Sequence, residues 1–102
     1  MAQQNVQRRL AAILVADVVG YSRLMGLDEA GTLSALKARQ RGVIDPLVQK
    51  HRGRIVNMMG DSVLAEFASA VNAVECAAAL QLEMVVENRD LPTDRRIVLA
   101  WG

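Results

Sequence analysis

Aromatic residues, cysteine and any excess of one charge are scarce in this sequence. Phe, Tyr and Trp together make up 3% of its 102 residues, so a folded core has to be built from aliphatic side chains. Cys76 is the only cysteine, which excludes an internal disulfide and a cluster of metal-binding cysteines, and it fits a reducing compartment. The formal net charge is only +1, so the chain lacks the excess of cations that is typical of nucleic-acid binding.

Long apolar runs are missing too. No stretch approaches the roughly 20 apolar residues that a membrane-spanning helix needs. Arg8 and Arg9 precede an apolar run, but Asp17 interrupts that run and no small-residue cleavage site follows, which excludes a signal peptide. We therefore expect a cytoplasmic chain that makes no membrane contact of its own, held at the cytoplasmic side of the membrane if a further portion of the protein carries an anchor.

The composition itself is that of a globular domain. Hydrophobic residues make up 52% of the chain and charged residues 23%, which is unlike a disordered sequence. A chain of this length can bury a single core. We expect residues 1–9 to form an N-terminal tail and residues 10–102 to form one domain or part of one.

Strands are expected in four places. Residues 10–17 are an apolar run without helical spacing, which is typical of a strand buried on both faces. Residues 54–58 and 63–67 are two further apolar segments, and the Gly-Asp pair between them favours a hairpin turn. The last strand is expected over residues 95–101, after a turn that contains Pro92.

Two helices are expected between these strands. Asp28 with Glu29 is typical of a helix start, and Pro46 is expected to kink or interrupt this helix near its end. Ser69 is expected to cap a second helix that runs to about Asn88. The apolar stripe of this second helix is formed by Val71, Val74, Ala78, Leu82 and Val85.

The order strand, helix, strand, strand, helix, strand predicts an α+β fold of the ferredoxin-like βαββαβ type, an antiparallel sheet with helices on one face. In this fold the first and third strands are central antiparallel neighbours. The first strand ends at Asp17 and the third begins just after Asp61, so we expect the two carboxylates to meet. The other sheet face is left bare, which indicates a dimer.

Two neighbouring carboxylates repel each other unless a cation or a proton lies between them. Mg²⁺ or Mn²⁺ suits such a site, because hard cations prefer oxygen ligands and share their shell with phosphates. The segment after Asp17 has a glycine and backbone amides ahead of a helix, which favours phosphate binding. The spacing alone leaves an alternative open, because an Asp after a strand is often a cap and Gly-Asp is common in hairpins.

Three segments of the chain carry a family resemblance: RRLAAILVADVVGYSRLMGLDEAGTL, HRGRIVNMMGDSVLAEFASAVNAVECA and LPTDRRIVLAWG. In this order they resemble the opening, the second motif block and the following strand of class III adenylate/guanylate cyclase catalytic domains, of the bacterial adenylate cyclase type. The similarity runs from about Arg8 to about Leu99. The chain is therefore identified as the N-terminal portion of such a domain, for which the ferredoxin-like sheet is the expected fold.

The resemblance implies a site and a reaction. Aspartates at the positions of Asp17 and Asp61 bind two Mg²⁺ or Mn²⁺ ions, and the carbonyl of Val18 is a further ligand. One ion activates the ribose 3′-hydroxyl for attack on the α-phosphate, and the other neutralises the triphosphate, so that ATP gives 3′,5′-cyclic AMP and pyrophosphate. The residues implied to bind the nucleotide are Val19, Gly20, Tyr21, Asn57 and Gly60. Family sites form between two catalytic domains, so we expect a homodimer or pairing with another cyclase domain.

Two departures from the family pattern bear on this reaction. Adenylate cyclases usually carry a base-reading Lys four residues before the second aspartate, where this chain has Asn57, so ATP is the expected nucleotide with GTP as an open alternative. The family's transition-state Asn and triphosphate-binding Arg follow the fourth strand, and the sequence ends at Gly102. The resemblance therefore implies little or no cyclase activity for these residues alone.

Three functions compete at this point. The resemblance favours a nucleotide cyclase domain of cyclic-nucleotide signalling. The alternative is a non-catalytic dimerisation or regulatory module on a cyclase scaffold. An unrelated ferredoxin-like domain that binds RNA or a metabolite ranks last, because RNA binding on such a sheet needs positive charge and an aromatic stripe. The three aromatic residues do not form that stripe: Tyr21, Phe67 and Trp101.

Overall fold

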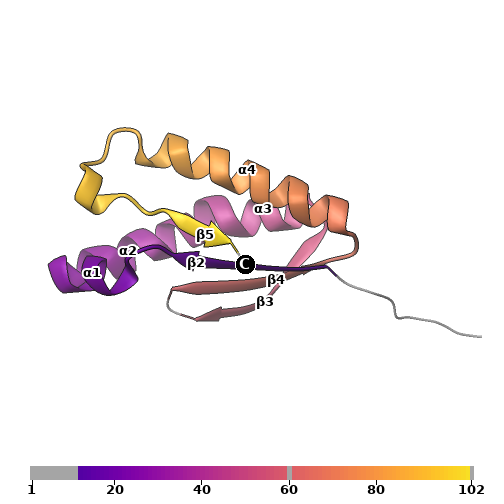
Figure 1. Ribbon diagram of the computed structural model, residues 1–102, viewed down its shortest axis with the longest axis horizontal. Coiled ribbons are helices and arrows are strands. Elements are labelled where there is room, and N and C mark those ends of the chain that lie inside the picture. The colour runs from indigo at the N-terminus through magenta and orange to yellow at the C-terminus, as the bar shows by residue number, and fades with distance from the viewer. Residues whose placement is uncertain (1–11, 60, 102) are drawn as a thin grey trace, which may run out of the picture.

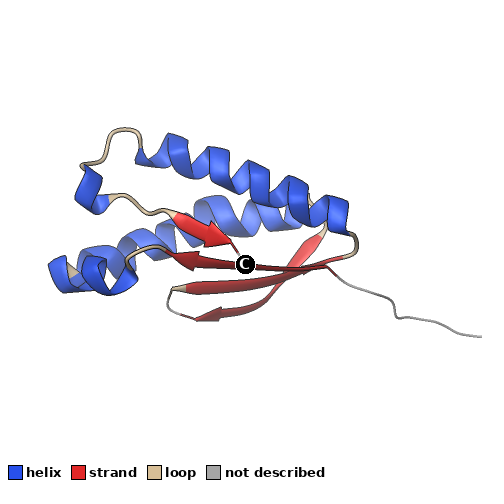
Figure 2. Cartoon of the chain, in the orientation of Figure 1, coloured by secondary structure: helices blue, strands red, loops and turns tan. Residues whose placement is uncertain are grey.

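The computed structural model of the chain describes residues 12–59 and 61–101. These residues form a four-stranded antiparallel sheet with helices on one face (Figures 1 and 2). The strands lie in the order β3-β4-β2-β5, and their bounds are Gly53–Met59 for β3, Ser62–Phe67 for β4, Ala12–Val18 for β2 and Leu99–Trp101 for β5. This order confirms the ferredoxin-like α+β fold, with the first and third strands as central neighbours.

Strand β2 is the centre of the sheet. It pairs antiparallel with β4, from Ala12 opposite Phe67 to Asp17 opposite Ser62, and its last residues pair with β5. Its side chains alternate, so Ala16 is buried against the helices whereas Asp17 is exposed and Ile13 is 52% exposed. The prediction that this strand is buried on both faces is therefore wrong for its described residues, because the helices cover only one face.

The first long helical segment confirms one cap and one interruption. Helix α2 (Glu29–Arg39) begins after Asp28, whose side chain accepts a hydrogen bond of 3.0 Å from the Gly31 amide. The chain continues through a π-helical turn, Gln40–Ile44, into α3 (Asp45–Lys50). Pro46 lies in the first turn of α3, and the interruption comes just before it because proline cannot donate the hydrogen bond that a regular helix requires there.

A short helix, α1 (Tyr21–Leu27), precedes this segment and was not predicted. It starts after Gly20, whose φ of 68° is left-handed and unstrained for glycine. It ends at Asp28, whose amide donates to the Leu24 carbonyl at 3.0 Å. Two glycines and a short length weaken the helical pattern of this segment in the sequence.

Helix α4 (Ala70–Asn88) begins and ends where the sequence predicts. The hydroxyl of its N-cap, Ser69, accepts a hydrogen bond of 3.1 Å from the Asn72 amide. The predicted apolar stripe, however, is on the wrong side of the helix. Its members face solvent with exposed fractions of 60–70% for Val71, Val74, Leu82 and Val85, while the side packed on the sheet carries Ala73, Cys76, Leu80 and Met84.

The turn between α3 and β3 explains where that strand begins. Arg52 has a positive φ of 63°, and Gly53 follows as the first residue of β3. A β-carbon at Gly53 would overlap the ring of Phe67, its register partner on β4. Phe67 is 1% exposed and is one of the few aromatic residues in an otherwise aliphatic core.

The last strand is shorter than predicted. Residues 95–101 were expected to form it, but β5 holds only Leu99–Trp101 and a 3₁₀ turn lies at Thr93–Arg95. Ahead of β5, the backbone of Ile97 pairs with a side chain instead of a strand: its amide donates to Asn88 Oδ1 at 3.0 Å, and its carbonyl accepts from Asn88 Nδ2 at 2.7 Å.

Among the described residues, no helix combines the length and the apolar character needed to cross a bilayer.

Candidate functional site

The end of β2 and the β3–β4 hairpin meet at one edge of the sheet. Asp17 is the register partner of Ser62, so Asp61, which precedes Ser62 in the hairpin turn, lies beside the end of β2. The Val18 amide donates to the Asp61 carbonyl at 2.8 Å, and the Ser62 hydroxyl donates to Asp17 Oδ1. The topology thus brings together the two aspartates that are 44 positions apart in the numbering, 61 minus 17.

The two carboxylates approach this edge from different sides. Asp17 belongs to the open face of the sheet and is exposed, whereas Asp61 is half-buried and lines a cavity on the helix side together with Val18 and Met58. Within residues 12–59 and 61–101 no group of three or more His, Cys, Asp or Glu side chains is arranged to hold a metal ion. A hard cation at this edge would therefore complete its shell with backbone carbonyls, water or phosphate oxygens.

The turn after β2 is only partly available for an anion. The Val19 amide donates to the Val98 carbonyl at 2.8 Å, so in this arrangement it is not free for the phosphate contact expected of it. Gly20 and Tyr21 stand at the N-cap and first position of α1, where backbone amides lack partners within the helix. The Arg23 guanidinium lies over this turn, with Nε and Nη2 both 3.7 Å from the point where a Gly20 β-carbon would be.

Asn57 lies on the open face because β3 contains a bulge. The register passes from Ile55 opposite Ala65 to Asn57 opposite Leu64, which leaves Val56 unpaired. Without this shift Asn57 would face the helices, since one residue of slippage moves every later side chain to the other face. Asn57 is exposed and lines a shallow hollow of about 200 Å³ with Val15, Ser62, Val63 and Leu64.

The remaining predicted site residue and two reactive side chains need only brief comment. Gly60 lies outside the described residues, as do residues 1–9 of the predicted tail. Cys76 is 0% exposed, and burial raises the pKa of its thiol to about 11, which keeps it protonated and inert. His51 Nδ1 lies 2.8 Å from the Leu47 carbonyl at the end of α3, so this ring nitrogen donates to the backbone of its own helix.

Sequence comparison finds relatives with a shared description. The chain is 61% identical over 102 residues to the protein named "Putative adenylate cyclase 3" of Rhizobium meliloti (strain 1021). The aligned region is 100% of this chain and 17% of that protein. It is 33% identical over 100 residues to an adenylate cyclase of Streptomyces coelicolor (strain ATCC BAA-471 / A3(2) / M145). Here the aligned region is 98% of this chain and 26% of that protein. The chain therefore spans about a quarter or less of these relatives, and no family model matches it.

Solved structures give the same fold. The adenylate/guanylate cyclase/hydrolase from Silicibacter pomeroyi superposes with a TM-score of 0.81 at 40% identity, covering 95% of this chain and 56% of that chain. The guanylyl cyclase Cya2 superposes with a TM-score of 0.76 at 24% identity, covering 90% and 51%. At that identity the second likeness concerns the fold alone.

Fold and edge geometry define a ferredoxin-like α+β domain with two aspartates side by side at the end of its central strands. The two relatives and the structural neighbour from Silicibacter pomeroyi support a class III nucleotide cyclase domain, which confirms the family resemblance seen in the sequence. The chain covers a small part of the relatives, so their activities are not transferred by similarity alone.

Proposed function

We propose that this chain supplies the metal- and triphosphate-binding half of a class III cyclase active site, which converts ATP to 3′,5′-cyclic AMP and pyrophosphate in cytoplasmic signalling. The observation that carries the proposal is the register of the central strands. It sets Asp17 beside Asp61 at the edge of the sheet, directly before the turn that holds Gly20. Two acidic residues next to a glycine turn are the elements that a metal-bound triphosphate needs.

The donor set suits two Mg²⁺ or Mn²⁺ ions. Asp17 and Asp61 offer carboxylate oxygens from the two sides of the sheet edge, and Val18 between them offers a backbone carbonyl. Bound here, the ions would neutralise the triphosphate and lower the pKa of the ribose 3′-hydroxyl. The residues of the chain hold the ligands in position: Ser62 orients the Asp17 carboxylate, and the Val18–Asp61 hydrogen bond ties the hairpin to β2.

The nucleotide is proposed to lie along the open face. The amides of Gly20 and Tyr21 and the Arg23 guanidinium would be near the triphosphate end, since Gly20 lies in the turn after Asp17 and the other two lie in the first turn of α1. Asn57 is on the same face as Asp17, where its amide can both donate to and accept from a base edge. ATP is the proposed nucleotide, and GTP is the alternative, because the Asn57 amide can form hydrogen bonds with either base.

A second cyclase domain is proposed to cover this face, in a homodimer or a heterologous pair. Ile13 is 52% exposed on it, and Val15 and Leu64 are only half-buried. An apolar surface of this kind is costly in water and would be removed from water by a partner. For these 102 residues alone we propose nucleotide binding with little or no turnover, because the family's transition-state residues have no counterparts in them.

A non-catalytic dimerisation or regulatory module is the second candidate. Two observations favour it: the Val19 amide is occupied by Val98, and the Asp17 carboxylate already accepts from Ser62. In a scaffold that no longer binds a ligand, polar groups of the former site would form hydrogen bonds within the chain, as these two groups do. The two candidates share the fold and the dimer and differ in metal-dependent nucleotide binding.

The test is calorimetric titration of a non-hydrolysable ATP analogue into the chain, with and without Mn²⁺. We expect binding that requires Mn²⁺ and that is lost in Asp17→Asn, which keeps the shape and the Ser62 contact but removes the charge. Asp90→Asn, an exposed carboxylate after α4, is the matched control and should bind as the parent chain does. Metal-independent binding, or no binding by the folded chain, would establish the non-catalytic module instead.

A further inference from the structure

A cavity of about 580 Å³ lies on the helix side of the sheet, between α2, the π turn and the last strand segment. This volume is within the range of small-molecule sites in proteins. Most of its lining is apolar, and the aliphatic side chains come from both layers, among them Leu33, Leu36, Ile44, Val63, Ile97 and Leu99. Charged side chains also reach it, and the most deeply placed of these is Arg39.

Arg39 is a buried cation with weak local compensation. It is 7% exposed, and its Nη1 donates to Asn88 Oδ1 at 3.3 Å and to the thioether sulfur of Met84 at 3.4 Å. The carboxylate of Glu87 is 4.0 Å from Nε and has a side chain 44% exposed. Burial lowers the pKa of Arg39, and Glu87 opposes this only in part. A guanidinium held in this way favours a further anion.

The free donors of Arg39 suit a carboxylate. A guanidinium has five N–H donors in a planar fork, and both contacts above use Nη1. Among the described side chains, Nη2 donates to no acceptor. A carboxylate can bind such a fork through two parallel hydrogen bonds, which are stronger than neutral ones.

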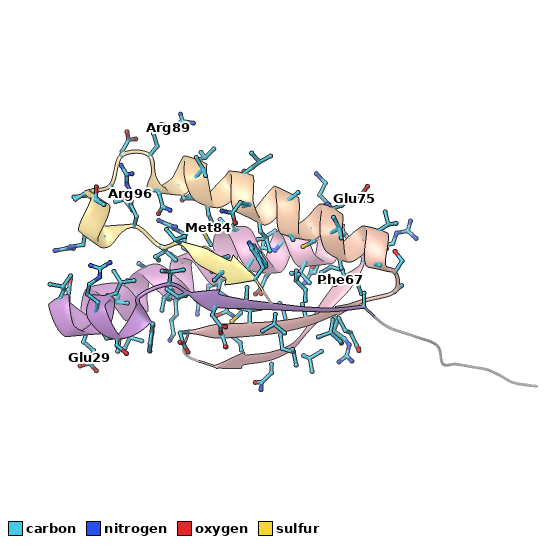
Figure 3. The ribbon with its side chains drawn as sticks, viewed as in Figure 1. Glu29, Phe67, Glu75, Met84, Arg89 and Arg96 are labelled. Atoms are coloured by element: carbon cyan, nitrogen blue, oxygen red, sulfur yellow. The ribbon has the colours of Figure 1, made fainter. Side chains whose placement is uncertain are left out.

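We infer that this cavity binds a small amphipathic carboxylate, whose charged end pairs with Arg39 and whose apolar body packs on the aliphatic lining. Met84, labelled in Figure 3, points from α4 into the molecule and marks the Arg39 wall of the cavity. A single negative charge fits better than two, because Asp61 also lines the cavity and would repel a dianion. The cavity shares Val18 and Asp61 with the proposed metal site, but carboxylate binding here needs neither nucleotide nor metal and is tested without them.

A purely structural role for Arg39 is the competing explanation. Through Asn88 it links α2 to the end of α4 and to Ile97, and that link alone would account for its position. It would not account for an aliphatic cavity beside the charge. The two explanations differ in whether a carboxylate binds more tightly than an uncharged molecule of the same length.

The experiment compares octanoate with 1-octanol by calorimetric titration into the folded chain, without metal or nucleotide. We expect one octanoate per chain, bound at least ten-fold more tightly than octanol. Arg39→Met should abolish this preference while leaving octanol binding unchanged. Arg41→Met, an exposed cation on the same helical run, is the control and should keep the preference. Equal binding of the two compounds, or no saturable octanoate binding, overturns the inference.

A second variant guards against misfolding of Arg39→Met. Ser34 is exposed and lines the cavity, so Ser34→Trp would narrow the cavity without touching the buried charge. We expect octanoate affinity to fall at least ten-fold in Ser34→Trp, with the far-UV circular dichroism of the parent chain. If Ser34→Trp binds octanoate as the parent does, the anion lies elsewhere and the inference is wrong. If Arg39→Met does not fold, the inference is tested by the octanoate affinity of Ser34→Trp and by the ratio of octanoate to octanol affinity in the parent chain.

Discussion

The two faces of the sheet differ in burial and in the residues that they carry. On the face covered by helices, Ala16, Ala65, Phe67 and Leu99 are at most 7% exposed and are all apolar. On the open face, Asp17 and Asn57 are exposed and polar, and Ile13 is 52% exposed. Since stability comes mainly from apolar burial, the covered face should determine the free energy of unfolding, and under the proposed function the open face should determine nucleotide binding and association with a second domain.

The largest effect is expected for Phe67→Ala on the covered face. Phe67 is 1% exposed and its ring packs on Gly53 across the strands, so its removal leaves a cavity that β3 and β4 cannot fill. We expect a loss of about 3–5 kcal/mol in the free energy of unfolding, measured by urea denaturation. Leu64→Ala, on the open face of the same strand, is the control and should cost much less. A comparable loss in both variants would mean that the open face is also covered.

A smaller loss is expected for Asn88→Ala. This side chain makes two hydrogen bonds with the Ile97 backbone and accepts one from Arg39, so its removal leaves buried polar groups without partners. We expect a loss of about 2–3 kcal/mol. Hydrogen exchange at the Ile97 amide should accelerate more than at the β4 amides, because Ile97 is hydrogen-bonded to the Asn88 side chain whereas the β4 amides pair within the sheet. Uniform acceleration across the sheet would show instead that the whole fold was weakened.

The sequence was sufficient to predict where α2 and α4 begin and that Asp17 and Asp61 lie close together. Asp28 and Ser69 cap their helices through hydrogen bonds to residues three positions away, which is a pattern visible in the chain itself. The proximity of Asp17 and Asp61 follows from strand order alone, because antiparallel neighbours bring the end of one strand to the start of the other. These features need no knowledge of packing.

Features that depend on packing escaped prediction. Helix α4 has apolar residues on most of its sides, so periodicity could not choose the buried side, and the sheet selects the one with Ala73 and Cys76. The bulge at Val56, which turns Asn57 to the open face, has no clear marker in the sequence. The Arg39–Asn88 contact joins residues 49 positions apart and becomes visible only when α2 and α4 are packed.

The buried thiol gives a pH-dependent way to test the covered face. The pKa of Cys76 is about 11 in the fold, above its ordinary value of 9.0, so the unfolded chain releases this proton first as the pH rises. Stability from this group is fully present below pH 9 and is lost between about pH 9 and 11, by an amount on the order of 2 kcal/mol. Urea denaturation at several pH values should show this slope, and Cys76→Ala should remove it. If the free energy of unfolding of Cys76→Ala still falls with pH in this range, the pH dependence comes from other titratable groups.

The smallest effect on stability, and the clearest on association, is expected for Ile13→Glu. Ile13 is 52% exposed on the open face, so the substitution removes few packing contacts and should change the free energy of unfolding by less than about 0.5 kcal/mol. A partner that covers this face would have to bury the new carboxylate, which is costly, so we expect sedimentation to show the proposed dimer for the parent chain and monomers for Ile13→Glu. Val71→Glu is the matched control, because Val71 is 64% exposed on the outer side of α4, far from the open face. If Val71→Glu dissociates the proposed dimer and Ile13→Glu does not, the interface is the apolar outer side of α4. The open face of the sheet would then not be the surface that binds the partner.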